Sequence, residues 1–289
     1  MATTYNTISI DGLNIFYREA GNKNAPAIVL LHGFPSSSHM FRDLIPELAS
    51  DYHVIAPDYP GFGYSDAPAA SEFTYTFDKL TEVVEKFINA LGLTKYSLFM
   101  QDYGGPIGFR IAAKHPERIQ SLIIQNANAY MEGISAAFEP MQAFWAERNG
   151  ETEKAPRSLL TRETTIFQYT HGASDVSRIS PDAWNHDQAL LDRPGNDLIQ
   201  LALLHNYTSN VALYGQWQEY FRTHQPHTLV VSGKNDPFFV PAGQEAFKRD
   251  IKNADVNFYD GGHFVLEEFH SEIAAKIRSF LSTKLAKAS

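Results

Sequence analysis

The stretch Leu98-Phe99-Met100-Gln101-Asp102-Tyr103-Gly104-Gly105, residues 98 to 105, decides the fold of this chain. An apolar strand runs into Asp102 and then into small residues, Gly104, Gly105 and Gly108, at the start of a helix. A sharp turn of this kind exposes one side chain at the carboxyl end of a strand, and it needs small residues where strand and helix cross. The segment therefore predicts a nucleophile elbow that presents Asp102. The alternative is that Asp102 only caps the helix.

Short apolar strands alternate with amphipathic helices on both sides of this turn. The predicted strands are 7–10, 13–18, 27–31, 54–56, 96–100, 119–125, 228–231 and 256–259. The predicted helices are 40–49, 77–91, 106–114, 242–249 and a last helix from Glu268 on. Asp11-Gly12 favours a tight hairpin between the first two strands. Apolar strands separated by helices indicate an α/β protein with a mostly parallel eight-stranded sheet, flanked by helices on both faces.

The alternation of strands and helices stops near Asn128 and resumes only at Thr228. The intervening residues, 129 to 225, lack β-branched runs and are rich in aromatic residues, Gln, Asn and helix formers. We interpret this segment as a helical cap, or lid, inserted into one core domain made of residues 1–128 and 226–289. Most of its aromatic side chains are expected to pack the cap against itself and the core.

Composition and charge limit the kinds of partner that the chain can have. Of the 289 residues, 44% are hydrophobic and 20% are charged, which is ordinary for a globular protein. The formal net charge is −9 and there is no Lys/Arg cluster, so neither nucleic acid nor an anionic membrane is an expected partner. There is no cysteine, and the sequence shows neither a signal peptide nor an apolar run long enough to cross a bilayer. We expect a cytoplasmic monomer or homodimer.

Two further polar residues follow predicted strands in the second half of the chain. Asp236 lies in Gly-Lys-Asn-Asp-Pro, and His263 lies in Gly-Gly-His-Phe after the last strand. Sites in open α/β sheets are built at the carboxyl ends of strands. A single loop histidine is usually structural, but Asp102, Asp236 and His263 give the order nucleophile, acid, histidine, each just past a strand. The sequence therefore predicts a catalytic triad.

The segment His-Gly-Phe-Pro at 32–35 also follows a predicted strand. Folds of this kind place a loop there whose backbone N–H faces the nucleophile. We expect the N–H groups of Phe34 and Tyr103 to form an oxyanion hole.

With these motifs the sequence resembles the α/β-hydrolase superfamily along nearly its whole length, and within it the branch with an aspartate nucleophile, the epoxide hydrolases and haloalkane dehalogenases. The motifs that carry the resemblance are HGFP at 32–35, DYPGFGYSD at 58–66, QDYGG at 101–105, KHPERI at 114–119, GKNDP at 233–237 and GGHF at 261–264. The resemblance implies an α/β-hydrolase fold and a two-step reaction. Asp102 forms an alkyl ester, and water activated by His263 hydrolyses it. No metal or organic cofactor is needed, and the partners are a small apolar substrate and water.

The leaving group decides between the two activities that this branch implies. An epoxide leaves as an alkoxide, which needs an acidic O–H, whereas a halide needs N–H donors. Tyr207 lies late in the cap, close to where epoxide hydrolases place a ring-opening tyrosine, and Tyr169 is a weaker substitute. Trp145 together with Tyr207 could instead form a halide pocket. The candidate leaving-group donors are thus Tyr207, Trp145 and Tyr169.

Residues near the nucleophile and in the loop at 32–35 favour neither activity consistently. Dehalogenases usually have Trp after the nucleophile and often Asn after His-Gly, where this chain has Tyr103 and Phe34. HGFP is common in epoxide hydrolases, whereas Gln101 is more typical of dehalogenases. Haloacids are disfavoured because the chain has Tyr103 and Pro106 where haloacid dehalogenases of this fold have arginines. The leading hypothesis is an epoxide hydrolase, with a haloalkane dehalogenase as the alternative and a non-catalytic ligand receptor as a distant one.

Overall fold

The computed structural model describes residues 2–285, and a single eight-stranded sheet forms its centre. The strands are β1 (Thr4–Ile10), β2 (Leu13–Ala20), β3 (Ala27–Leu31), β4 (His53–Pro57), β5 (Tyr96–Gln101), β6 (Ile119–Gln125), β7 (Thr228–Gly233) and β8 (Asp255–Tyr259). Their spatial order is β1-β2-β4-β3-β5-β6-β7-β8. Only the pairs β1–β2 and β2–β4 are antiparallel. The predicted α/β-hydrolase fold with a mostly parallel sheet is confirmed.

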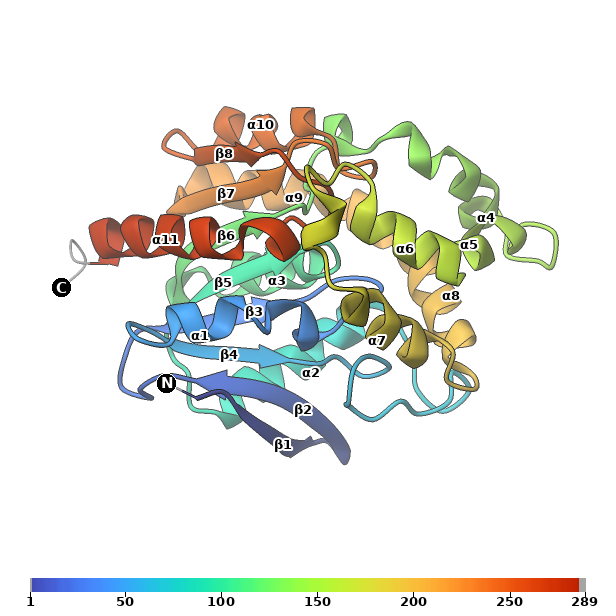
Figure 1. Cartoon of the computed structure of the whole chain (residues 1–289), viewed down its shortest axis with the longest axis horizontal. Coiled ribbons are helices and arrows are strands. Elements are labelled where there is room, and N and C mark those ends of the chain that lie inside the picture. The colour runs from blue at the N-terminus through green and yellow to red at the C-terminus, as the bar shows by residue number, and fades with distance from the viewer. Residues whose placement is uncertain (1, 286–289) are drawn as a thin grey trace.

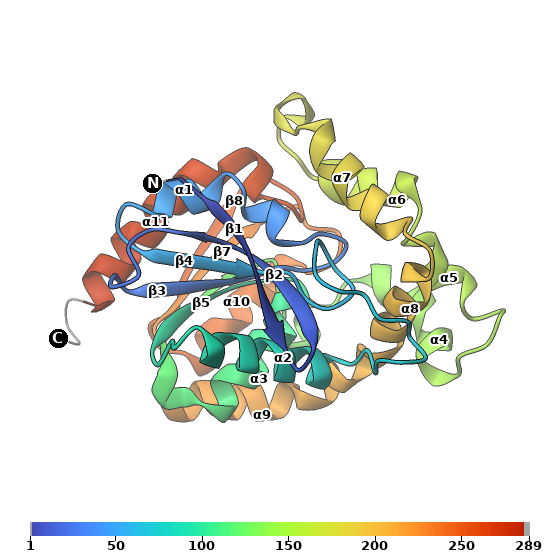
Figure 2. The same ribbon diagram turned by 90° about the horizontal axis from the view of Figure 1, so that it is seen from below.

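Helices cover both faces of the sheet (Figures 1 and 2). One face carries α1 (Leu44–Leu48) and α11 (Leu266–Leu285), and the other carries α2 (Phe77–Ala90), α3 (Gly104–Lys114) and α9 (Thr208–His224), with α10 (Pro241–Asp250) beside β7 and β8. The alternation of side chains along β3 explains both layers. Ile28 and Leu30 join the apolar cluster that includes α1 and α11, whereas Val29 and Leu31 join the cluster that includes α2, α3 and α9.

The predicted insertion is helical and lies at the end of the sheet where the parallel strands finish (Figure 2). Its elements before α9 are η3 (Met131–Gly133), η4 (Ala136–Met141), α4 (Gln142–Ala146), α5 (Lys154–Ser158), α6 (Arg162–Thr170), η5 (Val176–Arg178), α7 (Pro181–Leu191) and α8 (Asn196–Asn206). Helix α9 differs from these, because Trp217 and Phe221 pack their rings on Phe109 of α3. The cap boundaries of 129 and 225 stay a prediction, and the packing of α9 places it with the core helices.

Two predicted helices differ from the observed ones. The expected helix 40–49 is divided into the 3-10 turn η1 (Ser38–Phe41) and the short α1, because Pro46 lacks an N–H and fits only the first turn of a helix. The last helix starts at Leu266 rather than Glu268 and has non-helical torsions at Phe269. A short η2 (Pro116–Arg118) precedes β6. Within residues 2–285, no helix is both long and apolar enough to span a membrane.

The predicted core domain was given as residues 1–128 and 226–289. Residue 1 and residues 286–289 lie outside the described residues. The rest of both segments contributes every strand of the sheet.

Candidate active site

The turn between β5 and α3 holds Asp102 in the left-handed region of backbone torsions, with φ of 47°. Few residues other than glycine adopt this conformation, and such strain gathers at functional sites. Close packing of the helix on the sheet fixes the turn. A Cβ atom on Gly104 would overlap the backbone carbonyl of Leu31, and one on Gly108 would overlap the side chain of Met100. The small residues of the predicted elbow are therefore required by the crossing of strand and helix.

The carboxylate of Asp102 lies among backbone donors. The N–H of Phe34 donates to its Oδ1 at 2.7 Å, and the N–H of Tyr103 also donates to this carboxylate. No side chain caps α3, whose N-cap position is occupied by Tyr103. Asp102 therefore does not serve as the cap of this helix. Both predicted oxyanion-hole groups face the carboxylate instead.

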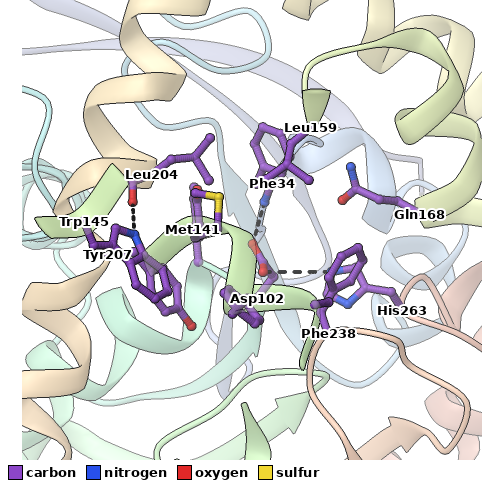
Figure 3. A pocket seen from close by; sticks show the side chains of 13 residues that line it. Phe34, Asp102, Met141, Trp145, Leu159, Gln168, Leu204, Tyr207, Phe238 and His263 are labelled. Atoms are coloured by element: carbon purple, nitrogen blue, oxygen red, sulfur yellow. Dashed lines mark hydrogen bonds and ion pairs between the residues drawn. The ribbon is translucent and has the colours of Figure 1, made fainter. Parts of the chain in front are cut away.

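His263 and Asp236 reach Asp102 from loops that follow β8 and β7. The Nδ1 atom of His263 lies 2.9 Å from Oδ2 of Asp236, and its Nε2 atom lies 3.9 Å from Oδ2 of Asp102 (Figure 3). The N–H of Phe238 donates to the other oxygen of Asp236 at 2.8 Å. Burial alone would lower the pKa of His263, but the charge and hydrogen bond of Asp236 outweigh burial and raise it. The structure brings all three residues of the predicted triad together.

Two polar residues that the sequence interpretation did not select complete this cluster. The Nε2 atoms of Gln101 and His263 lie 2.9 Å apart, and Nδ2 of Asn126 donates to Oδ2 of Asp236 at 2.7 Å. When His263 is neutral, its Nε2 can accept from the Gln101 amide while its Nδ1–H points to Asp236. Gln101 and Asp236 thus hold the imidazole ring in place, with Nε2 toward Asp102. Gln101 ends β5 and Asn126 directly follows β6, so a polar residue at the carboxyl end of a buried strand was the available signal.

The electrostatic environment of Asp102 is set by burial. Burial raises the pKa of Asp102 to about 6, and the positive potential of His263 and the N–H groups of Phe34 and Tyr103 limit the increase. The group is therefore ionised at neutral pH, yet poorly solvated. A desolvated carboxylate held by two donors is more nucleophilic than one in water, and its second oxygen remains free to attack.

A cavity opens directly above Asp102. Its lining residues are Phe34, Asp102, Tyr103, Ala137, Phe138, Met141, Trp145, Leu159, Gln168, Leu204, Tyr207, Phe238 and His263. Most of them are apolar, and none is Lys or Arg. This lining suits a small, neutral, largely apolar molecule. Among residues 2–285, no group of three or more His, Asp or Glu side chains is arranged to hold a metal ion.

Two tyrosines line this cavity. Tyr103 and Tyr207 are both buried, and their ring centroids lie 6.4 Å apart. Within the described part of the chain, the hydroxyl of Tyr103 has no hydrogen-bond partner, whereas that of Tyr207 interacts with Tyr214. Burial, followed by the nearby charge of Asp102 for Tyr103 and by Tyr214 for Tyr207, raises both pKa values well above 10. Both hydroxyls are therefore protonated at neutral pH.

The other two predicted donors are placed less favourably. Trp145 lines the cavity, but its indole N–H donates to the backbone carbonyl of Leu204 at 2.9 Å (Figure 3). Tyr169 does not line the cavity. Its hydroxyl donates to Asp187 at 2.5 Å, and its ring stacks on Phe264 with centroids 4.0 Å apart. This placement does not support the donor role predicted for Tyr169, because its hydroxyl is bonded to Asp187 and its side chain is not part of the cavity wall.

The sequence is similar to a known protein family and to several named proteins. The family described as alpha/beta hydrolase fold matches residues 26–269. An uncharacterized hydrolase of Saccharomyces cerevisiae is 40% identical over 276 residues, covering 94% of each chain. A haloalkane dehalogenase of Mycobacterium marinum is 42% identical over 291 residues, covering 93% of this chain and 89% of the relative. Epoxide hydrolase 4 of Mus musculus is 39% identical over 122 residues, which is 42% of this chain and 34% of the relative.

Solved structures share the fold at lower identity. A mutant of haloalkane dehalogenase DatA from Agrobacterium tumefaciens superimposes with a TM-score of 0.81 at 24% identity, covering 97% of both chains. Haloalkane dehalogenase DbeA from Bradyrhizobium elkani gives a TM-score of 0.80 at 22% identity, covering 100% of both chains. At these identities the likeness concerns the fold alone.

Proposed function

The chain belongs to the α/β-hydrolase fold family, and from that premise we propose that it is an epoxide hydrolase acting through a covalent ester on Asp102. The observation that carries the proposal is that two buried tyrosines, Tyr103 and Tyr207, line the same cavity as a carboxylate held at a strained turn. An alkoxide leaving group requires such O–H donors.

The first step would be attack on the epoxide. Oδ2 of Asp102 attacks one ring carbon, the C–O bond of that carbon breaks, and its electron pair passes to the epoxide oxygen. A tyrosine hydroxyl donates its proton to this oxygen, which gives a hydroxyalkyl ester. Oδ1 of Asp102 stays with the N–H of Phe34 throughout, because that contact already exists in the free protein.

The second step would be hydrolysis of the ester. His263 accepts a proton from water through Nε2, and the resulting hydroxide attacks Cγ of Asp102. The developing negative charge falls on Oδ1, where the N–H groups of Phe34 and Tyr103 stabilise it. Collapse of the intermediate breaks the bond between Cγ and the ester oxygen; this oxygen takes the proton of the newly added hydroxyl and leaves as the diol, and Asp102 is again a carboxylate. The proton on His263 then restores the tyrosine through solvent, and Asp236 stabilises the transient histidinium.

A haloalkane dehalogenase is the second candidate, and one observation favours it. The Mycobacterium marinum relative, which is 42% identical to this chain, bears that name. The site would then hold the halide with the hydroxyls of Tyr103 and Tyr207, since the indole N–H of Trp145 is bonded to Leu204. Two O–H donors suit a basic alkoxide better than a weakly basic halide, which is why the epoxide is preferred.

Turnover of styrene oxide and of 1-bromobutane separates the two candidates. We expect phenylethanediol from the epoxide and little bromide from the haloalkane. The variants Tyr103→Phe and Tyr207→Phe are each expected to lower kcat/KM for styrene oxide by roughly ten- to a thousandfold. Tyr96→Phe is the matched control, because it removes a buried, unpartnered hydroxyl from the opposite end of β5. Bromide release without diol formation, or unchanged epoxide turnover in both cavity variants, would refute the epoxide proposal.

A further inference from the structure

One polar side chain in the cavity has no part in the proposed chemistry. Gln168, on α6, lines the cavity and is only 2% exposed. Among residues 2–285, its Nε2 atom has no hydrogen-bond partner. Leaving a buried amide donor unpaired costs free energy, so such a group in a native protein calls for an explanation. Its neighbours on the cavity wall, including Leu159 and Phe34, are apolar and offer it nothing (Figure 3).

The rest of α6 shows that Gln168 is not placed there by packing alone. The hydroxyl of Thr165, three residues earlier, donates a hydrogen bond to Gln188 at 2.7 Å, and the hydroxyl of Tyr169 donates one to Asp187. These buried polar side chains of the helix are thus paired with α7. Gln168 lines the cavity instead, and in the part of the chain that the structure describes its Nε2 is left without a partner. A leucine would fill the same space without the desolvation cost.

The position of Gln168 relative to Asp102 indicates what it would bind. In Figure 3, Tyr207 and Trp145 lie on one side of Asp102, and Gln168 lies on the other, above His263. A substrate whose epoxide oxygen points to the tyrosines therefore directs its remaining chain toward Gln168. Nε2 is a donor, and rotation of the amide about its last torsion would bring its N–H to the cavity, where it would recognise an acceptor atom on that chain.

The lining also decides the charge of that acceptor. No Lys or Arg lines the cavity, and its acidic member, Asp102, would repel an anion. A carboxylate on that part of the substrate would find no Lys or Arg to compensate for its desolvation. The acceptor is therefore a neutral oxygen.

We propose that Gln168 is a specificity residue and that the preferred substrates are epoxides bearing a neutral ether oxygen next to the epoxide-bearing unit, as in aryl glycidyl ethers. This inference rests on the proposed function and deepens it. Gln168 touches no reacting atom. Its amide selects and orients the substrate, in the way that a small number of polar groups orient ligands in otherwise apolar pockets.

The test uses two epoxides of equal shape, glycidyl phenyl ether and 1,2-epoxy-4-phenylbutane, in which a methylene replaces the ether oxygen. The ratio of their kcat/KM values is compared between the wild-type protein and Gln168→Leu. We expect the preference for the ether to fall by roughly five- to tenfold in the variant, the size of one neutral hydrogen bond. Met141→Leu, which changes another cavity residue without altering its polarity, is expected to leave the ratio unchanged.

Binding of the two product diols, 3-phenoxypropane-1,2-diol and 4-phenylbutane-1,2-diol, gives a readout that needs no turnover. Calorimetry should show tighter binding of the ether diol by the wild-type protein and no difference in Gln168→Leu. Equal slowing of both epoxides in the variant would place Gln168 beside the hydrolytic water and overturn the specificity role. Turnover of both epoxides with an unchanged ratio would also overturn it, while leaving the epoxide proposal intact. Absence of epoxide turnover would overturn the proposed function, and the diol affinities would still decide the role of Gln168.

Discussion

The substitution Asp102→Asn should stabilise the protein, and by an amount that depends on pH. The pKa of Asp102 is raised from 3.8 to about 6 in the folded protein, chiefly by burial. A carboxyl group with a raised folded-state pKa opposes folding once it is ionised. The difference of about 2 pKa units corresponds to about 2 to 3 kcal/mol at 1.36 kcal/mol per unit.

The pH window of this effect follows from the two pKa values. Below about pH 4 the carboxyl group is protonated in both states, so its ionisation contributes nothing to the difference between wild type and variant. Between about pH 4 and pH 6 the unfolded state ionises while the folded state resists, and the cost to the wild type increases. Above about pH 6 the full cost is present, and the advantage of the variant is constant.

Urea unfolding of both proteins between pH 4 and pH 8 measures this difference directly. Asp51→Asn is the matched control, because Asp51 is exposed and the substitution removes the same formal charge. Its unfolding free energy should change by less than about 0.5 kcal/mol at every pH. An advantage of Asp102→Asn that is absent at pH 8, or that is equally large at pH 4, would refute the assignment of a desolvated carboxylate to this turn.

Three other outcomes are expected. The value of kcat/KM for an epoxide should fall below about pH 6, because only ionised Asp102 can attack; a profile that stays flat to pH 4.5 would contradict this. Gln101→Leu should slow ester hydrolysis about tenfold and let the alkyl-enzyme accumulate in stopped-flow experiments, because His263 loses the amide that orients Nε2; slower ester formation instead would argue against it. Gly33→Ala should lower turnover by about a hundredfold, because the added Cβ would overlap Asp102, whereas Gly150→Ala, which meets no atom, should be neutral.

The three triad residues could be predicted from the sequence, because the local pattern of strands, turns and small residues determines their positions. Asp102 could be singled out since small residues must follow it at a strand-to-helix crossing, and Asp236 and His263 since each follows an apolar strand. The carboxyl ends of parallel strands meet at one edge, so their proximity follows from the alternation pattern alone. The eight predicted strands are all observed, in the predicted succession along the chain.

The residues that line the cavity could not be predicted in the same way. They depend on which face each short cap helix turns toward the cavity. Tyr169 and Gln168 are adjacent in α6, yet only Gln168 lines the cavity. The hydrogen bond from Trp145 to the carbonyl of Leu204 joins residues 59 positions apart and comes from tertiary packing. Weakly amphipathic helices give the sequence little information about such orientations.

The covalent ester on Asp102 is tested most directly by intact-protein mass spectrometry of His263→Gln after incubation with styrene oxide. Without the histidine base, ester formation proceeds but hydrolysis does not, so the protein should gain the mass of one epoxide. Peptide mapping should place the adduct on Asp102, and Asp102→Asn should show none. An unmodified His263→Gln protein, or an adduct on another residue, would contradict the proposed reaction.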